Sequence, residues 1–297
     1  MVSAKPEGLS RIWSALITPT KADESVNYDA LETIVDRQIA EGAEGFYCCG
    51  SSGEALLLSL EERKQVLEHT LAAAAGRVPV ISHVGTIRTR DVIELAAHAM
   101  DAGAVAVSMI PPYYYRFSMD EIIGYYEDVL AALPGAPVIV YNIPQFTGVE
   151  FSKQNAARLL GNPGVVGVKH TSSNLYSLER MKEAYPDKIF LNGFNEQFLA
   201  ALTMGATATI GTTVNLFAPL FHKVRDAVAA GELERAQRWQ REINLRVEET
   251  VRIGIFPAMK YGWTLRGVDC GNCRAPFRPL GPEARQAMEA LLERPLE

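Results

Sequence analysis

Short apolar runs rich in β-branched residues alternate with longer amphipathic stretches through most of the sequence. This alternation predicts strand–helix units arranged around a parallel sheet. The apolar runs that have the length of a buried strand are Ile12–Leu16, Gly45–Cys48, Pro79–His83, Ala106–Met109, Pro137–Asn142, Val165–His170, Lys188–Asn192 and Ala208–Gly211. Eight strands alternating with helices are typical of an α/β protein with a (β/α)8 TIM barrel. A doubly wound open sheet is the alternative, but it normally has fewer strands, and no G-x-G-x-x-G motif follows the first run.

Helix-start signals precede several of the amphipathic stretches, which cover Leu31–Ile39, Leu60–Ala74, Val92–Met100, Ile122–Leu130 and Leu175–Tyr185. Ser59 precedes a first turn that contains Glu61 and Glu62, and Ser118 stands three residues before Glu121. A serine followed at the third position by glutamate is the pattern of a capping box. We therefore expect helices to begin directly after Ser59 and directly after Ser118.

The strand pattern stops after Phe217, and the remaining sequence is helical in character. The helices expected there cover Lys223–Arg252, Ala258–Arg266 and Pro282–Leu292, with a break at Ile255–Pro257. These stretches show no apolar core of their own. We expect residues 1–222 to form the barrel and residues 223–297 to form a helical extension packed on the barrel or on a second subunit.

The composition is that of a globular protein with an acidic balance. Apolar residues make up 48% of the chain and the formal net charge is -6, without a basic run that would bind a phosphate backbone. We therefore expect no nucleic-acid partner. The first residues lack the apolar region of a signal peptide, and no apolar run is long enough to span a bilayer. We expect a cytoplasmic protein that does not contact a membrane.

Cysteines and histidines show no metal-binding pattern. Cys270 and Cys273 have C-x-x-C spacing, but Cys48 and Cys49 do not form the second pair of a zinc site. The five histidines show no H-E-x-x-H or comparable spacing. We expect reduced, structural thiols and no metal.

The apolar run Val165–His170 carries a lysine, Lys169, near its end. Lysine is rarely buried without a partner. Burial lowers the pKa of a lysine, and the neutral amine can attack a ketone to form a Schiff base. The alternative is a strand-end lysine whose ammonium group reaches solvent. The residues that follow the other strands favour the reactive amine, as the next segments show.

Hydroxyl and phenol groups follow the strands at the end of a barrel where active sites lie. The second strand precedes Gly50–Glu54, in which Ser51 and Ser52 provide donors suited to a small carboxylate. The fifth strand ends with Tyr141, and strand order places this phenol next to Lys169. Ordinary turn and capping roles are the alternative for each segment taken alone. Together the segments favour a lysine imine site.

Three further strand ends carry polar or aromatic residues. Tyr113–Phe117 follows the fourth strand, Asn192–Glu196 follows the seventh, and Gly211–Asn215 follows the eighth. The amide, carboxylate and hydroxyl groups of the last two segments suit a polyhydroxylated substrate. They lack the glycine-rich loop of a barrel phosphate site.

These motifs resemble those of the class I pyruvate-dependent aldolases that include dihydrodipicolinate synthase and N-acetylneuraminate lyase. The hydroxyl motif is Gly50–Glu54, the tyrosine motif is Tyr141–Pro144, and the lysine motif is Gly167–Lys169. They follow the order and approximate spacing of the family over essentially the whole chain. The resemblance implies a TIM barrel, a Schiff-base mechanism without a cofactor, and a homotetramer.

Within the family the likeness is to the N-acetylneuraminate lyase branch, through Tyr113–Ser118, Leu175–Arg180, Tyr185–Asp187 and Cys273–Phe277. The synthase branch has an arginine that holds a substrate carboxylate where this chain has Phe146, and an apolar ring cannot replace a guanidinium group. The implied activity is the reversible aldol cleavage of N-acetylneuraminate, a keto sugar acid, to pyruvate and N-acetylmannosamine. A pyruvate aldolase or dehydratase for a shorter 2-keto-3-deoxy sugar acid, and a catalytically silent ligand-binding relative, are the alternatives.

The resemblance also implies roles for individual residues. Lys169 forms the imine, Tyr141 moves the proton, and Tyr114 supports the proton relay from a neighbouring subunit. Ser51 and Ser52 hold the keto-acid carboxylate. The positions that match the family's contacts to the hydroxyl chain of the sugar are Thr171, Gly193, Asn195, Glu196 and Thr212. The lyase branch usually has aspartate in place of Asn195 and serine in place of Thr212. These two differences bear on how the hydroxyl chain of the sugar is recognised.

Overall fold

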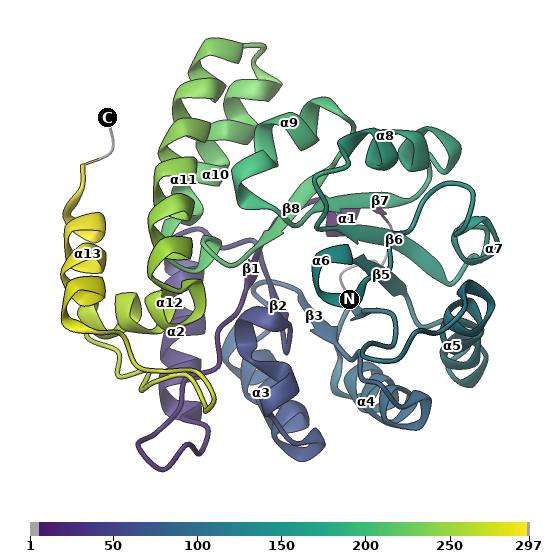
Figure 1. Cartoon of the computed structure of the whole chain (residues 1–297), viewed down its shortest axis with the longest axis horizontal. Helices are drawn as coiled ribbons and strands as arrows, with labels where there is room; N and C mark the ends of the chain where they lie inside the picture. Colours follow the sequence, from purple (N-terminus) through teal and green to yellow (C-terminus); the bar gives the residue numbers. More distant parts are fainter. Residues whose placement is uncertain (1–5, 296–297) are drawn as a thin grey trace.

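Residues 6–295 are described by a computed structural model. In this range parallel strands, each hydrogen-bonded to the next, form a closed barrel in which β8 pairs with β1 (Figure 1). The strands are β1 (Ile12–Ala15), β2 (Gly45–Cys48), β3 (Val80–His83), β4 (Ala106–Met109), β5 (Val138–Asn142), β6 (Val165–His170), β7 (Ile189–Asn192) and β8 (Ala208–Gly211). The predicted (β/α)8 barrel is confirmed, and the open-sheet alternative is wrong.

Helices surround the barrel (Figure 1). Those up to β8 are α1 (Pro6–Leu9), α2 (Tyr28–Ala40), α3 (Leu60–Ala74), α4 (Thr89–Ala102), α5 (Met119–Ala132), α6 (Pro144–Thr147), α7 (Ala157–Leu160), α8 (Leu175–Ala184) and α9 (Phe198–Thr203), with short 3-10 turns η1 (Ser51–Gly53), η2 (Ala55–Leu57) and η3 (Asn195–Gln197). Both predicted capping boxes are present, at Ser59 with Glu62 and at Ser118 with Glu121. In each box the serine hydroxyl and the glutamate carboxylate accept backbone N–H groups that have no partner within the helix.

Alternate residues of each strand pack on opposite sides of the barrel wall. Side chains such as Trp13, Tyr47, Ile139 and Leu191 form a core inside the barrel. The alternating residues, such as Val140, pack outward in a second core that includes the helices. Because the wall is buried on both faces, the strands are continuous apolar runs. This explains why the sequence pattern located them well.

The C-terminal helices are α10 (Val214–Ala229), α11 (Leu233–Ile253), α12 (Ile255–Leu265) and α13 (Pro282–Glu293), and they lie together on one side of the barrel (Figure 1). Their buried residues Met259, Trp263 and Met288 belong to the same outer core as the barrel helices. The extension therefore packs on the barrel. The predicted division at residue 222 falls inside α10, and two-domain organisation stays a prediction.

The single long helix predicted over Lys223–Arg252 is wrong. The chain turns between α10 and α11 at Gly231, whose φ of +74° is a left-handed conformation that glycine adopts without steric cost. The predicted break at Ile255–Pro257 is also wrong, since α12 includes these residues and the interruption lies at Gly254. Pro257 falls in the first turn of α12, where a missing N–H removes no intrahelical hydrogen bond.

The described residues show no helix long and apolar enough to cross a membrane, and no group of three or more His, Cys, Asp or Glu side chains arranged to hold a metal ion. The cysteines Cys48, Cys49, Cys270 and Cys273 are all buried free thiols.

Candidate active site

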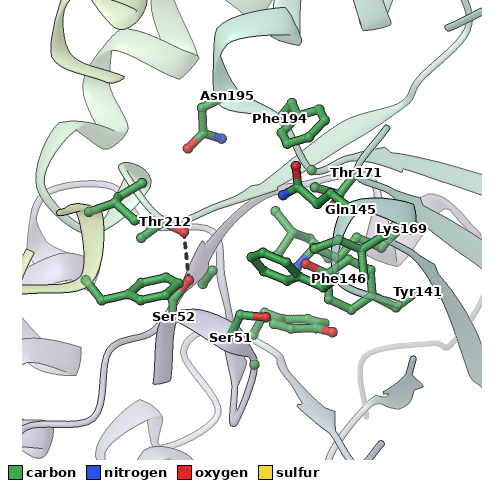
Figure 2. Close-up of a pocket in the computed structure, with 18 of the residues that line it drawn as sticks. Ser51, Ser52, Tyr141, Gln145, Phe146, Lys169, Thr171, Phe194, Asn195 and Thr212 are labelled. Carbon is green, nitrogen blue, oxygen red and sulfur yellow. Dashed lines mark hydrogen bonds between the residues drawn. The ribbon is translucent and has the colours of Figure 1, made fainter. Parts of the chain in front are cut away.

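A cavity of about 170 Å³ opens at the carboxyl ends of the barrel strands (Figure 2). It is lined by nine of the ten residues expected from the sequence, namely Ser51, Ser52, Tyr141, Lys169, Thr171, Gly193, Asn195, Glu196 and Thr212. Tyr114 is the exception: its side chain is 87% exposed outside this cavity, on a backbone with φ of +77°. A role for Tyr114 in the cavity of its own chain finds no support in this arrangement.

Lys169 projects into the barrel from β6, and its side chain is only 4% exposed. Its Nζ lies 4.1 Å from the ring centre of Tyr47 and 3.9 Å from that of Tyr141. Among the described residues no carboxylate forms an ion pair with this amine. Burial therefore lowers the pKa of Lys169 to about 7. The alternative of a lysine that reaches solvent is excluded, and a large fraction of the amine is neutral near pH 7.

Tyr141 stands directly beside Lys169, because β5 and β6 pair in a register that aligns these two residues. Burial raises the pKa of Tyr141 to about 12, while the nearby hydroxyl groups of Thr171 and Ser51 act in the opposite direction. Near neutral pH this side chain is a phenol. It can donate a proton, and the phenolate left behind is a strong base.

Asn142 and His170 are the next aligned residues of β5 and β6, and their hydrogen bonds fix the two strands relative to each other. The Asn142 amide donates to Nδ1 of His170 over 3.0 Å, and Nε2 of His170 donates to the Asn174 carbonyl over 3.1 Å. Burial lowers the pKa of His170 to about 4, so the ring is neutral and its Nδ1 can accept. Asn142 and His170 thus join β5 to β6 immediately beyond Tyr141 and Lys169.

The loop after β2 is joined to the loop after β8 across the end of β1, the strand that lies between them. The hydroxyl oxygens of Ser52 and Thr212 are 2.7 Å apart and share a hydrogen bond, drawn as a dashed line in Figure 2. Ser51 and Ser52 begin the turn η1, and the hydroxyl of Ser51 lies near the phenol of Tyr141. This places hydroxyl donors in the same cavity as the amine of Lys169.

The side of the cavity away from Ser51 is formed by Phe194 and by Asn195 of η3 (Figure 2). Oδ1 of Asn195 accepts hydrogen bonds from the Thr213 backbone N–H over 3.1 Å and from the Thr213 hydroxyl over 2.7 Å. Its Nδ2 is buried without a hydrogen-bond partner in the described part of the chain. The Glu196 side chain is exposed at the cavity rim. The acceptor of Asn195 is therefore used within the chain, and its Nδ2 packs closely against Gly211.

Comparison with known proteins identifies the family. The sequence pattern of the Dihydrodipicolinate synthetase family matches residues 8–295. The chain belongs to this family. It is 44% identical over 270 residues to the N-acetylneuraminate lyase of Rhizobium meliloti. The aligned region covers 91% of this chain and 90% of that relative. The family predicted from the sequence motifs is confirmed.

Solved structures of other family members have the same fold. CdNal of Clostridium difficile, solved in complex with mannosamine, superposes with a TM-score of 0.93 at 28% sequence identity. The match covers 96% of this chain and 98% of the CdNal chain. A catalytic lysine mutant of the Ruminococcus gnavus sialic acid aldolase has a TM-score of 0.92 and 28% identity, covering 95% of this chain and 94% of its own.

Several side chains of this family member line the cavity without having been expected there. They are Tyr47, Gln145, Phe194, Val247, Val251 and Phe256. Tyr47 lies on the inner face of β2, which strand alternation alone could have indicated. Val247 and Val251 come from α11 and Phe256 from α12, and no sequence signal relates these helices to the barrel mouth. Phe146 also lines the cavity.

Gly193 allows a close approach between the ends of β6 and β7. A Cβ atom added there would lie 1.7 Å from Oγ1 of Thr171. Gly193→Ala is therefore expected to displace Thr171 and to lower kcat/KM by about 10-fold or more, with a loss of ~1–3 kcal/mol in the free energy of unfolding. Steady-state assays and chemical denaturation measure both effects.

Gly124→Ala is the matched control, because a Cβ added at Gly124 of α5 meets no atom within 4 Å. It is expected to leave kcat/KM unchanged and to raise helix stability by about 0.5–1 kcal/mol. Equal behaviour of the two variants would contradict the close packing of Thr171 on Gly193.

Proposed function

We propose that the chain is a Schiff-base aldolase that cleaves N-acetylneuraminate reversibly to pyruvate and N-acetylmannosamine. The observation that carries the proposal is the buried amine of Lys169, with its pKa near 7, beside the phenol of Tyr141. The relative from Rhizobium meliloti is named for this carbon–carbon lyase activity, and the Ruminococcus gnavus aldolase has a lysine described as catalytic. The enzyme is therefore a lyase of this family.

Imine formation is the first step. The neutral amine of Lys169 adds to the C2 ketone of the open-chain substrate, and the resulting carbinolamine loses water. Tyr141 is suited to protonate the departing oxygen, since burial keeps it a phenol until that moment. The product is a protonated imine on Lys169, which takes the place of an uncharged ketone and attracts electrons strongly.

Bond cleavage follows. The Tyr141 phenolate, or the substrate carboxylate acting beside it, accepts the proton of the C4 hydroxyl as the C3–C4 bond breaks. The bonding electrons move into the protonated imine and leave an enamine, while C4 becomes the aldehyde of N-acetylmannosamine. Protonation of the enamine and hydrolysis of the imine then release pyruvate and return the amine. Lys169, Tyr141 and the substrate's own carboxylate supply the amine and the proton-transfer groups of these steps, so we expect no cofactor.

Substrate recognition is divided between the two sides of the cavity. Ser51 and Ser52 bind the carboxylate beside the imine, consistent with their hydroxyl groups near Tyr141 and Thr212. Thr171, Gly193, Asn195, Glu196 and Thr212 bind the hydroxyl chain. Phe146 at the cavity wall cannot bind a second carboxylate, which disfavours a synthase reaction.

The second candidate function is an aldolase or dehydratase for a shorter 2-keto-3-deoxy sugar acid. It is favoured by Asn195, whose Oδ1 is occupied by Thr213 and so offers a long hydroxyl chain fewer acceptors. Comparing kcat/KM for N-acetylneuraminate and for 2-keto-3-deoxygluconate separates the two. We expect turnover of N-acetylneuraminate to be preferred. A strong preference for the shorter acid would contradict the sialate assignment.

The pH dependence of imine formation follows from the environment of Lys169. Its pKa is lowered from 10.5 to about 7, so the reactive neutral form is lost as the pH falls through about 7. We expect the rate of pyruvate trapping by cyanoborohydride to rise with a midpoint near pH 7 and to fall about 10-fold per pH unit well below it. Mass spectrometry of the reduced adduct measures this rate. A rise confined to pH values above about 9 would contradict the burial of the amine.

We further propose a cytoplasmic homotetramer. Tyr114 is too exposed to act in its own cavity, so its proposed part in the proton relay requires a neighbouring subunit. Light scattering that shows a fully active monomer would contradict this shared site.

A further inference from the structure

Glu54 closes the hydroxyl loop Ser51–Gly53, and no step of the proposed reaction uses it. Its backbone adopts the left-handed conformation, with φ of +55° and ψ of +32°, although it carries a long side chain. The side chain is 2% exposed. A non-glycine residue in this conformation costs free energy and persists only where the surroundings fix it.

The group that fixes Glu54 is Lys260 of α12. Its Nζ lies 2.6 Å from Oε1 of Glu54, and the Lys260 side chain is 1% exposed. The other carboxylate oxygen, Oε2, accepts the backbone N–H of Arg274 over 2.7 Å. Nζ of Lys260 also donates to the Asn272 carbonyl over 3.0 Å. One carboxylate thus joins the loop after β2 to two separate parts of the C-terminal extension.

Burial of both charges makes this pair unlike a surface ion pair. Removing two charged groups from water is costly, and their attraction compensates only when the geometry is good and further hydrogen bonds complete it. Such a pair is weak evidence for stability alone. Glu54 follows Gly53 directly and stands two residues after Ser52. The ion pair therefore constrains the loop that carries the hydroxyl groups at the cavity.

We propose that Glu54 and Lys260 are positioning residues for carboxylate binding. The pair holds the turn of Ser51 and Ser52 in the orientation that receives the carboxylate of the 2-keto acid, and it makes the C-terminal extension part of the active-site framework. Neither residue contacts the substrate. This inference rests on the proposed function, because it assumes that pyruvate binds at Lys169 beside these hydroxyl groups.

The test uses Glu54→Gln and Lys260→Met in the full-length protein. The readout is the pyruvate concentration that gives half-maximal cyanoborohydride trapping on Lys169. We expect this concentration to rise by about 10-fold or more in each variant, because a misplaced hydroxyl pair binds the carboxylate less well. The pH midpoint of trapping should stay near 7, since the burial that sets the pKa of Lys169 is unchanged.

Arg246→Met is the matched control. Within residues 6–295, Arg246 and Glu242 form a second buried ion pair, with Nη1 of Arg246 2.5 Å from Oε2 of Glu242. This pair lies within α11 and does not include the hydroxyl loop. Breaking it should lower the unfolding midpoint comparably but leave the half-saturating pyruvate concentration within about twofold of the unmodified protein.

Glu54→Asp and Lys260→Arg keep both charges and test the proposal if a single charge loss prevents folding. Lys260→Arg should restore most pyruvate affinity, whereas Glu54→Asp, with its carboxylate one methylene shorter, should weaken it. The positioning role is overturned if all folded variants behave like Arg246→Met, losing stability without losing pyruvate affinity. Absence of a pyruvate adduct in the unmodified protein would instead contradict the proposed function itself.

Discussion

Replacing Lys169 by methionine is expected to lower kcat/KM for N-acetylneuraminate cleavage by at least about 10⁴-fold, because Lys169 is the one lysine of residues 6–295 that lines the cavity and can form the imine. Methionine is unbranched and flexible enough to fill the space between the rings of Tyr47 and Tyr141. A steady-state assay that couples pyruvate release to a reductase measures the loss.

The Lys169→Met variant should also fold at least as stably as the unmodified protein at pH 7. Burial disfavours the charged amine and lowers its pKa, so the lysine costs folding free energy that methionine does not. Lys153→Met, at an exposed lysine, serves as a control with unchanged activity. Retention of more than about one tenth of the activity in Lys169→Met would contradict an imine at this residue.

Replacing Tyr141 by phenylalanine is expected to lower kcat/KM by about 10²–10⁴-fold, the range typical of losing a general acid–base group. The ring that packs against Lys169, Tyr47 and His83 remains in place. Only the proton-transferring oxygen is removed. Slow trapping of pyruvate on Lys169 should persist, which distinguishes this variant from Lys169→Met.

Tyr126→Phe is the control for Tyr141→Phe. Tyr126 is also fully buried, and its hydroxyl donates to the Met109 carbonyl over 2.9 Å, outside the cavity. Its loss should reduce the free energy of unfolding by about 1 kcal/mol and leave turnover within about twofold. Similar kinetics for the two phenylalanine variants would contradict the proton-transfer role of Tyr141.

The barrel could be predicted from sequence because its signals are local. Buried parallel strands are continuous apolar runs, and the capping boxes at Ser59 and Ser118 depend on residues three positions apart. The error over Lys223–Arg252 arose because helical propensity is similar on both sides of Gly231, and a single left-handed glycine redirects the chain. Pro257 does not break the helix, because proline is tolerated in a first turn.

The cavity was predicted in part for a similar reason. Strand order alone brings Lys169, Tyr141 and Ser51 to the same end of the barrel. The burial that lowers the pKa of Lys169 depends on the rings of Tyr47 and Tyr141 packed around its amine, which is a property of three strands together. Val251 and Phe256 were not expected, because their placement depends on how α11 and α12 pack across the barrel mouth.

Reductive trapping tests the central claim most directly. The protein is incubated with pyruvate and borohydride, digested, and sequenced by mass spectrometry. The proposed mechanism predicts a single reduced pyruvyl adduct, located on Lys169. Absence of an adduct, or an adduct confined to another lysine, would contradict the Schiff-base mechanism and the function built on it.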